Sequence, residues 1–331
     1  MTNTATPLNN RGGDAGESRL KAAIFNEFSW IWGGTILLFV VCAIVAPGVI
    51  KPGAINTMLP FAAILAITAV GMTIVIQQRG LDMSLPGTMT LSGLLFAKIG
   101  FLTDSTLLAV PATLLIAVVI GSVNGLLVAR VNITPIVTTL ATNAILLGAV
   151  RTISGGSYMT APEELAAFSH SRVAGIPTTV ILAVLFIIVV SLVTKRSVAG
   201  RRFVAVGANP AAATAAGIPI LRYQVATYAV AALCYAVAGM LFTGYIGTAS
   251  HIAGNDYLLP AIAAVVVGGT PFSGGRGSVI ASGIAALFMT LLGQMVLALG
   301  ADTSVQLLVQ ALAIIIAVTI RYLPQLFLFF R

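Results

Sequence analysis

Few residues in this 331-residue chain have types and spacing that could do chemistry. His170 and His251 stand alone, without Cys or Asp at metal-ligand spacing, and Cys42 and Cys234 lie far apart inside apolar runs. The chain contains no HExxH motif, no nucleophile elbow and no close pair of carboxylates. We therefore expect no catalytic residue and no metal site.

Two glycine clusters could form either a nucleotide-binding loop or a turn between helices. They are Gly268-Gly269-Thr270 and Gly274-Gly275-Arg276-Gly277. A phosphate-binding loop needs Gly-Lys-Ser/Thr at the start of a helix, and no lysine occurs here. The clusters instead favour a tight turn where helices approach closely. We therefore expect this chain to bind no nucleotide or other cofactor.

The amino-acid composition indicates the class of protein to which the chain belongs. Hydrophobic residues make up 58% of the chain and charged residues only 8%, whereas soluble domains are about 25% charged. The net charge of +8 comes from cations that stand singly or in short groups between apolar runs, without a basic face or interleaved aromatics. This pattern argues against nucleic-acid binding and predicts an all-α, polytopic membrane protein in contact with the lipid bilayer.

The apolar runs set the number of membrane spans, because a helix needs about 20 apolar residues to cross the hydrocarbon core. Cutting the chain at its charged residues leaves ten substantial windows, so we expect about ten transmembrane helices within a transmembrane domain at 28–322. The polar residues 1–27 are expected to form a disordered cytoplasmic tail, and 323–331 a cytoplasmic C-terminal tail. The windows are 28–50, 52–78, 83–97, 105–129, 131–150, 173–194, 223–255, 257–275, 277–301 and 303–320.

The cations indicate the orientation of these spans. With the N-terminus inside, thirteen Lys and Arg residues fall on the inner side and four on the outer side. This asymmetry predicts that both termini are cytoplasmic. The longest external segment is then 151–177, which we expect to be a surface loop with a short helix. The four outer cations are Lys51, Lys98, Arg151 and Arg172.

The inner segment 195–222 carries five cations and no acid. Within it, Asn209 and Pro210 can start a helix, and Gly217 can end it after an alanine-rich run. A two-turn helix of small residues could fit a cleft on another protein. A solvated loop whose charges only anchor the topology is the alternative.

The two halves of the chain resemble each other. Leu59-Pro60 and Leu259-Pro260 each open an apolar run that reaches a glycine-rich turn. Internal duplication with broken helices is common in transporters, although chance similarity between apolar segments remains an alternative.

Asp82 is the one acid in the core region that needs an explanation. An ionised side chain near hydrocarbon costs about 2.5–3.5 kcal/mol, so it should be paired or beside water. Arg79 could pair with it across one helical turn, or Asp82 could cap a helix that starts near Ser84. The cap is the favoured interpretation, with direct gating and solute contact as alternatives.

Thr138, Thr139, Thr142 and Asn143 share much of one face of a span that contains hardly any charge. Hydrogen bonding between helices is the simplest interpretation, and a polar strip facing a pathway is the alternative.

Four stretches resemble the ribose-type permeases, the membrane subunits of bacterial ATP-binding-cassette sugar importers, over nearly the whole chain. The resemblance implies a core that contains a second, identical or related protomer in the cytoplasmic (inner) membrane. It further implies ATPase subunits that use ATP and dock on 195–222, and a periplasmic solute-binding protein. The stretches are GMTIVIQQRGLDMSLPG (71–87), NITPIVTTLATNAILLGAVRTISGG (132–156), VAVGANPAAATAAGI (204–218) and AIAAVVVGGTPFSGGRGSVIASG (261–283).

The chain departs from the family pattern at three places. Pro210 and Ala211 stand where the docking loop usually has an acid, so docking would depend on shape. Arg79 replaces a glycine, and Leu85-Pro86 replaces Val-Gly.

The expected cargo is an uncharged polar solute such as a monosaccharide or polyol, since the spans offer hydroxyls and amides but almost no ions. The alternative is an ion-coupled secondary transporter or channel that works without an ATPase. The expected coupling residues are Gly207, Asn209, Ala212, Ala213 and Gly217; those for gating or structure are Arg79, Asp82, Ser84, Gly269, Gly275 and Arg276; those for the pathway are Thr138, Thr139, Thr142 and Asn143.

Overall fold

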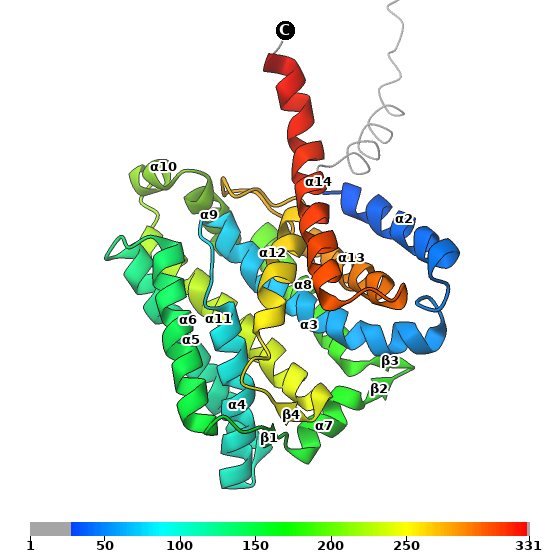
Figure 1. Ribbon diagram of the computed structural model, residues 1–331. Coiled ribbons are helices and arrows are strands. Elements are labelled where there is room, and N and C mark those ends of the chain that lie inside the picture. The colour runs from blue at the N-terminus through cyan, green and yellow to red at the C-terminus, as the bar shows by residue number, and fades with distance from the viewer. Residues whose placement is uncertain (1–27, 330–331) are drawn as a thin grey trace, which may run out of the picture.

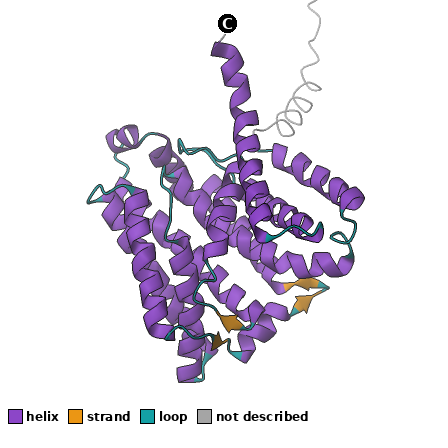
Figure 2. Cartoon of the chain, viewed as in Figure 1, coloured by secondary structure: helices purple, strands orange, loops and turns teal. Residues whose placement is uncertain are grey.

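The computed structural model describes residues 28–329 of the chain, and its helices dominate the fold (Figure 2). The predicted tail at 1–27 lies outside these residues, and of 323–331 only the helical part to Phe329 is described. The helices are α2 (Trp30–Val45), α3 (Pro52–Gln77), α4 (Leu85–Thr103), α5 (Thr106–Ala129), α6 (Pro135–Ser154), α7 (Glu163–His170), α8 (Thr178–Arg196), α9 (Val198–Ala208), α10 (Pro210–Ala215), α11 (Ile220–Ile246), α12 (Asn255–Val267), α13 (Val279–Ala298) and α14 (Thr303–Phe329).

Each of the ten predicted windows contains most of one long helix, because an apolar run in lipid must satisfy its backbone groups internally. Seven helices in the described chain are long and apolar enough to cross a membrane: α3, α4, α5, α6, α8, α11 and α13. The apolar parts of α2, α12 and α14 are shorter. The fold is therefore confirmed as an all-α, multi-span membrane protein.

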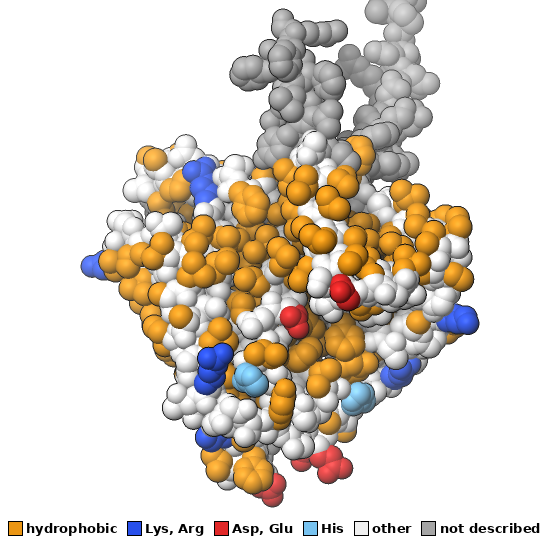
Figure 3. Space-filling model, in the orientation of Figure 1, with side chains coloured by type: hydrophobic (Ala, Val, Ile, Leu, Met, Phe, Trp, Pro, Cys, Tyr) orange, Lys and Arg blue, Asp and Glu red, His pale blue; other side chains and the backbone are white. Residues whose placement is uncertain are grey.

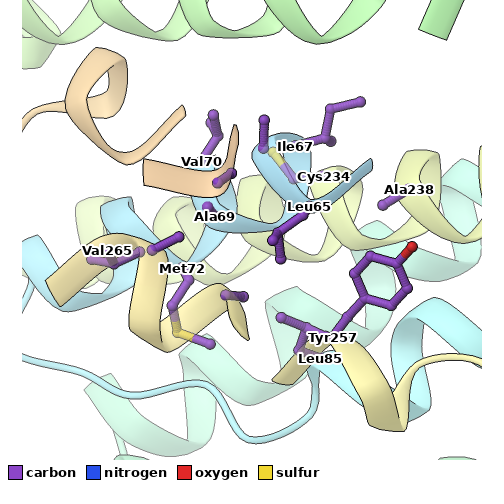
Figure 4. Close-up of a cluster of buried hydrophobic side chains, with 14 of the residues drawn as sticks. Leu65, Ile67, Ala69, Val70, Met72, Leu85, Cys234, Ala238, Tyr257 and Val265 are labelled. Carbon is purple, nitrogen blue, oxygen red and sulfur yellow. The ribbon is translucent and has the colours of Figure 1, made fainter. Parts of the chain in front are cut away.

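α3 is the central helix. It is buried along most of its length, and its side chains contact α11, α12 and α13 (Figures 1 and 4). Figure 4 shows Met72 of α3 near Val265 of α12, with Cys234 and Ala238 of α11 in the same cluster. Any force applied to either end of α3 is therefore transmitted to three neighbouring helices.

The outer helices have an apolar exposed surface. Large apolar side chains are exposed on α5, α6 and α8, for example Leu115 (65%), Ile145 (71%) and Leu185 (53%). Figure 3 shows apolar side chains spread across the middle of one face, with Lys and Arg mainly toward its margins. In water such a surface would aggregate, whereas in a bilayer it contacts acyl chains.

Two small strand pairs lie among the connections. β1 (Met159–Thr160) pairs antiparallel with β4 (Thr248–Ala249), far away in sequence, and β2 (Arg172–Val173) forms a local hairpin with β3 (Ile176–Pro177). β1, α7, β2 and β3 together form the predicted loop with a short helix at 151–177. α9 and α10 lie at the opposite end of the molecule from α7, β1 and β4 (Figure 1).

The charge-defined windows miss the ends of some helices. α4 continues through Lys98 to Thr103 because the Lys98 ammonium donates to the Ile153 carbonyl oxygen at 3.2 Å. α8 includes Lys195 and Arg196, and α9 is a further helix that the sequence did not indicate.

Candidate functional site

The alanine-rich helix predicted within 195–222 is present as α10. The Asn209 side chain accepts a hydrogen bond from the Ala212 amide at 3.1 Å, so Asn209 is the N-cap, and Pro210 occupies the first turn. Gly217, at φ +74°, ends the helix, because its amide donates to Thr214 and the Ile218 amide to Ala213. Ala212 is exposed, whereas Ala213 is buried against the chain itself.

α9 connects α10 to the membrane core. The Ser197 hydroxyl accepts from the Gly200 amide at 2.8 Å and caps the start of α9. At the other end, Asn209 both ends α9 and begins α10, so the two helices share one residue as their boundary. A displacement of α10 therefore moves the C-terminal end of α9.

The C-terminal end of α9 is held by side chains that follow α3. The Gln78 amide donates to the Phe203 carbonyl oxygen at 2.7 Å, and the Arg79 Nε donates to the Gly207 carbonyl oxygen at 2.8 Å. Arg79 also donates from Nη2 to the carbonyl oxygen of Ala208. The last carbonyls of a helix have no partner within it, and the Arg79 guanidinium satisfies two of them here. Its positive charge also interacts favourably with the partial negative charge at the C-terminal end of the helix.

Three segments thus meet at what we call the junction: Gln77–Arg79, Phe203–Ala208 and Gly274–Gly277. The Gly275 amide donates to the Gln77 carbonyl oxygen at 2.8 Å. Glycine is required where the segments touch: a Cβ on Gly207 would lie 2.1 Å from the Gln77 carbonyl oxygen. A Cβ on Gly275 would lie 2.5 Å from the Ala208 Cα.

Arg79 donates to α9, and no ion pair between Arg79 and Asp82, the alternative raised from the sequence, occurs within the described residues. Arg79 lies just after the end of α3 at φ +62°, its amide donates to Ile76, and the Gly80 amide donates to Val75. This is a Schellman ending, whose left-handed position favours glycine, and it directs the Arg79 guanidinium to α9. Gly269 ends α12 in the same way, at φ +92°, with its amide bonded to Val266.

Asp82 does not cap α4: the N-cap position is Ser84, and Asp82 lies two residues earlier, in the turn that leads into the helix. It is 1% exposed, and its Oδ1 accepts from the Ser84 amide at 2.9 Å and from the Ser84 hydroxyl at 2.5 Å. Ser84 in turn accepts from the Asn124 side chain at 3.1 Å, and Asn124 accepts from the Thr142 hydroxyl at 2.5 Å. A hydrogen-bonded chain therefore runs from the start of α4 to α5 and α6.

The predicted polar strip on α6 lies against the same end of α4. Thr139 accepts from the Met83 amide at 2.9 Å, and Asn143 accepts from the Gly87 amide at 2.7 Å. Thr138 is 4% exposed, and its hydroxyl has no hydrogen-bond partner within the described chain. Hydrogen bonding between helices accounts for Thr139, Thr142 and Asn143, and a pathway role for the strip stays a prediction. Arg276 lies exposed in the loop between α12 and α13, within the junction.

Residues 54–318 match the family described as the permease component of the branched-chain amino acid transport system. The chain belongs to this family. The curated relatives of the permease include a ribose import permease protein of Bacillus subtilis, 33% identical over 86% of this chain and 89% of the relative. An autoinducer 2 import system permease protein of Enterobacter sp. is 32% identical over 80% and 84%.

A probable ABC transporter permease protein of Sinorhizobium fredii is 30% identical and covers 96% of both chains. No solved structure gives a significant match. The permease is thus a multi-pass inner-membrane subunit of an ATP-binding-cassette importer, in which ATP is hydrolysed by a separate subunit.

Sequence reasoning about the permease missed Gln77, Gln78 and Phe203, which complete the junction. Two adjacent amides at the end of a long apolar helix are a usable signal, because buried polar groups need partners. The Phe203 carbonyl oxygen that accepts from the Gln78 side chain lies 125 residues away in sequence, so no local pattern could supply it.

Proposed function

We propose that this permease passes a small uncharged polar solute, most simply a monosaccharide or polyol, from a periplasmic binding protein into the cytoplasm. ATPase subunits would dock on α10 and drive the gate. The single observation that carries this proposal is the junction, where the exposed helix α10 is tied through α9 to the end of the central helix α3.

The proposed topology has ten spans and cytoplasmic termini. In support, the segments predicted to be cytoplasmic in the middle of the chain, α9 and α10, lie at the opposite end from the predicted external segment with α7 (Figure 1). The shorter apolar helices α2, α12 and α14 would be the remaining three spans, crossing with help from their neighbours or from flanking polar residues.

We propose that motion of a bound ATPase is transmitted from α10 to α3 and α4. A bound ATPase would move α10 as a rigid piece, since its cap and its Schellman ending fix both ends. The three donors on Gln78 and Arg79 would carry that motion to the segment between α3 and α4. Asp82 and its hydrogen-bonded chain would then pass it to α5 and α6.

The nature of the solute follows from what the spans lack. The seven helices long enough to cross contain no Asp or Glu, so they offer no carboxylate for coupling to an ion gradient. Relatives are named for the import of ribose and autoinducer 2. The ion-coupled alternative has only Asp82, whose carboxylate oxygen already accepts two bonds from Ser84, and the exposed Asp256 in the first turn of α12.

The proposed partners are a second permease protomer, identical or related, two ATPase subunits and a solute-binding protein on the side of α7. The test is reconstitution of the chain with the ATPase and binding protein encoded beside it. We expect uptake of a labelled sugar only with ATP and the binding protein. Uptake by this chain alone, driven by an ion gradient, would contradict the proposal.

A further inference from the structure

An apolar groove of about 340 Å³ opens between α8 and α11, at the end of the molecule that carries α9. Its α11 wall is formed by Tyr223, Ala226, Thr227 and Val230, which share one helical face. This face extends about 10 Å along the helix axis.

The opposite wall is α8, through Val189, Val190, Val193 and Thr194. Ile74 of α3 also lines the groove. Val189 (49%), Val193 (50%) and Val230 (39%) are exposed, so the groove is open on the lipid-facing side.

The surface of the groove is apolar, although two of the residues that line it, Thr194 and Thr227, carry hydroxyl groups. The Thr194 hydroxyl donates to the Val190 carbonyl oxygen at 2.8 Å, and the Thr227 hydroxyl donates to the Tyr223 carbonyl oxygen at 2.7 Å. Both hydroxyls are therefore used within their own helices. What remains for an occupant is a hydrocarbon surface, without directional contacts.

Cations stand at the end of the groove near α9. Arg196 is the last residue of α8 and shares a helical face with Val189 and Val193, at spacings of seven and three. Arg222 lies near the start of α11, four residues before Ala226 and on the same face. Both arginines are exposed, and neither forms an ion pair within the described part of the chain.

The first two turns of α9 close this end through Ala199, Gly200 and Phe203. Arg201 lies within these turns and donates to the Arg196 carbonyl oxygen at 3.5 Å. The segment 195–222 contains no acid. The groove thus has a hydrocarbon interior and a positively charged mouth without an internal counter-ion.

We propose that the groove between α8 and α11 binds an anionic phospholipid of the cytoplasmic leaflet. Its acyl chain would lie between the valines of the two helices, and its phosphate would lie between Arg196 and Arg222. Tyr223 stands at the level where tyrosine side chains concentrate at the membrane interface. The cytoplasmic leaflet carries the anionic lipids that such cations attract.

The charge also argues against a protein occupant. A second copy docked symmetrically on this face would bring its own arginines toward Arg196 and Arg222, and like charges would oppose the contact. The open side of the groove faces the hydrocarbon region, where a soluble ATPase does not reach.

The lipid would brace α9 against α8 and α11, beside the junction. This role is independent of which solute is carried. It also holds if the coupling assignment of α10 fails, because the groove uses neither α10 nor Arg79.

The first test places the photoreactive residue benzoylphenylalanine at Val230 of the full-length chain. The protein is embedded in nanodiscs with equal amounts of phosphatidylglycerol and phosphatidylcholine. After irradiation, mass spectrometry should find mainly the phosphatidylglycerol adduct. Equal labelling by both lipids, a protein adduct, or no lipid adduct would overturn the proposal.

The second test measures the phosphatidylglycerol that the purified chain retains, by native mass spectrometry. Arg196→Gln and Arg222→Gln should each reduce retention roughly five-fold. The matched control Arg130→Gln removes an exposed cation at the end of α5, outside the groove, and should leave retention unchanged. A loss in the control equal to that in the groove variants would overturn the assignment.

The third test separates the acyl chain from the head group. Ala226→Phe fills the groove at an exposed position and keeps every cation, so it should expel the lipid without disturbing the core. Inorganic phosphate at millimolar concentration should not displace the lipid from the unmodified chain. Retention in Ala226→Phe, or displacement by phosphate, would reduce the site to a surface cation cluster and overturn the groove.

Discussion

The Arg79 Nε lies 2.8 Å from the carbonyl oxygen of Gly207, although the two residues are 128 positions apart in the chain. This contact ties the end of the central helix α3 to the end of α9, two residues before Asn209, the boundary with α10. Arg79 therefore has two features that a substitution would change. Its backbone is in the left-handed region, and its side chain holds the end of α9, which is the segment proposed to move.

Replacing Arg79 with glycine tests whether the contact transmits motion. Glycine removes about 1–2 kcal/mol of left-handed strain, but the change deletes charge-assisted hydrogen bonds of about 1.5–3 kcal/mol each. The losses exceed the gain, so we expect Arg79→Gly to loosen α9 and to lower solute uptake per ATP hydrolysed several-fold. Uptake and hydrolysis are measured together in proteoliposomes.

Arg79→Lys is the matched control, because it keeps the charge and loses the planar fork that reaches two carbonyls. It should give an intermediate ratio of uptake to hydrolysis. If Arg79→Gly retains the normal ratio, the junction does not couple the two processes.

Ala212→Asp tests the docking surface. Ala212 is exposed on α10, so an ATPase cleft that receives it would bury an uncompensated carboxylate. We expect affinity for the ATPase to fall more than ten-fold, with no change in the thermal unfolding of the isolated permease. The neutral variant Ala212→Ser should bind nearly normally. Ala213→Asp, at a position already 3% exposed within the chain, should lower the unfolding temperature as well.

Gly207→Ala tests the close approach at the junction. The added Cβ would lie 2.1 Å from the Gln77 carbonyl oxygen, so α9 must shift away from α3, at a cost of about 1–3 kcal/mol. Lower thermal stability and weaker uptake are expected together. Gly148→Ala is the matched control: nothing lies within 4 Å of its Cβ position, and it should keep or raise stability. An unchanged Gly207→Ala protein would contradict the close contact.

The sequence predicts the helices well and the contacts between them poorly, for a physical reason. Apolar length alone indicates where α3, α5 and α13 lie, since lipid forces such runs to be helical. The cap at Asn209 and the ending at Gly217 depend on neighbours within a few residues, so they were predictable too. The positions of these helices and the two ends of α10 therefore depend only on residues close in sequence.

Contacts between residues far apart in sequence could not be predicted in this way. A pairing of Arg79 with Asp82 was possible from their spacing, but the left-handed turn at Arg79 directs its side chain to α9. For the strip on α6, hydrogen bonding between helices was the simplest interpretation, without an indication of the partner helix. Only the placement of α4 shows that Thr139 and Asn143 accept from its first amides. α9 was missed because Gly200 and Gly207 lower its helix propensity, and tertiary contacts outweigh that deficit.

Substitutions at Asp82 test whether its carboxylate only holds the turn before α4 or also supplies a charge needed during transport. Its Oδ1 accepts from the amide and the hydroxyl of Ser84, and an asparagine oxygen can accept both bonds. Asp82→Asn should therefore keep uptake within about two-fold of the original, because an uncharged Asn can hold the same turn with its side-chain oxygen. Asp82→Ala removes the acceptor and leaves buried Ser84 donors without that partner, so it should lower stability by about 1–3 kcal/mol and reduce uptake. Sugar uptake and thermal unfolding of both variants provide the measurement. If Asp82→Asn abolished uptake while the protein stayed folded, the negative charge itself would be required, and Asp82 would belong to the gate or to an ion site.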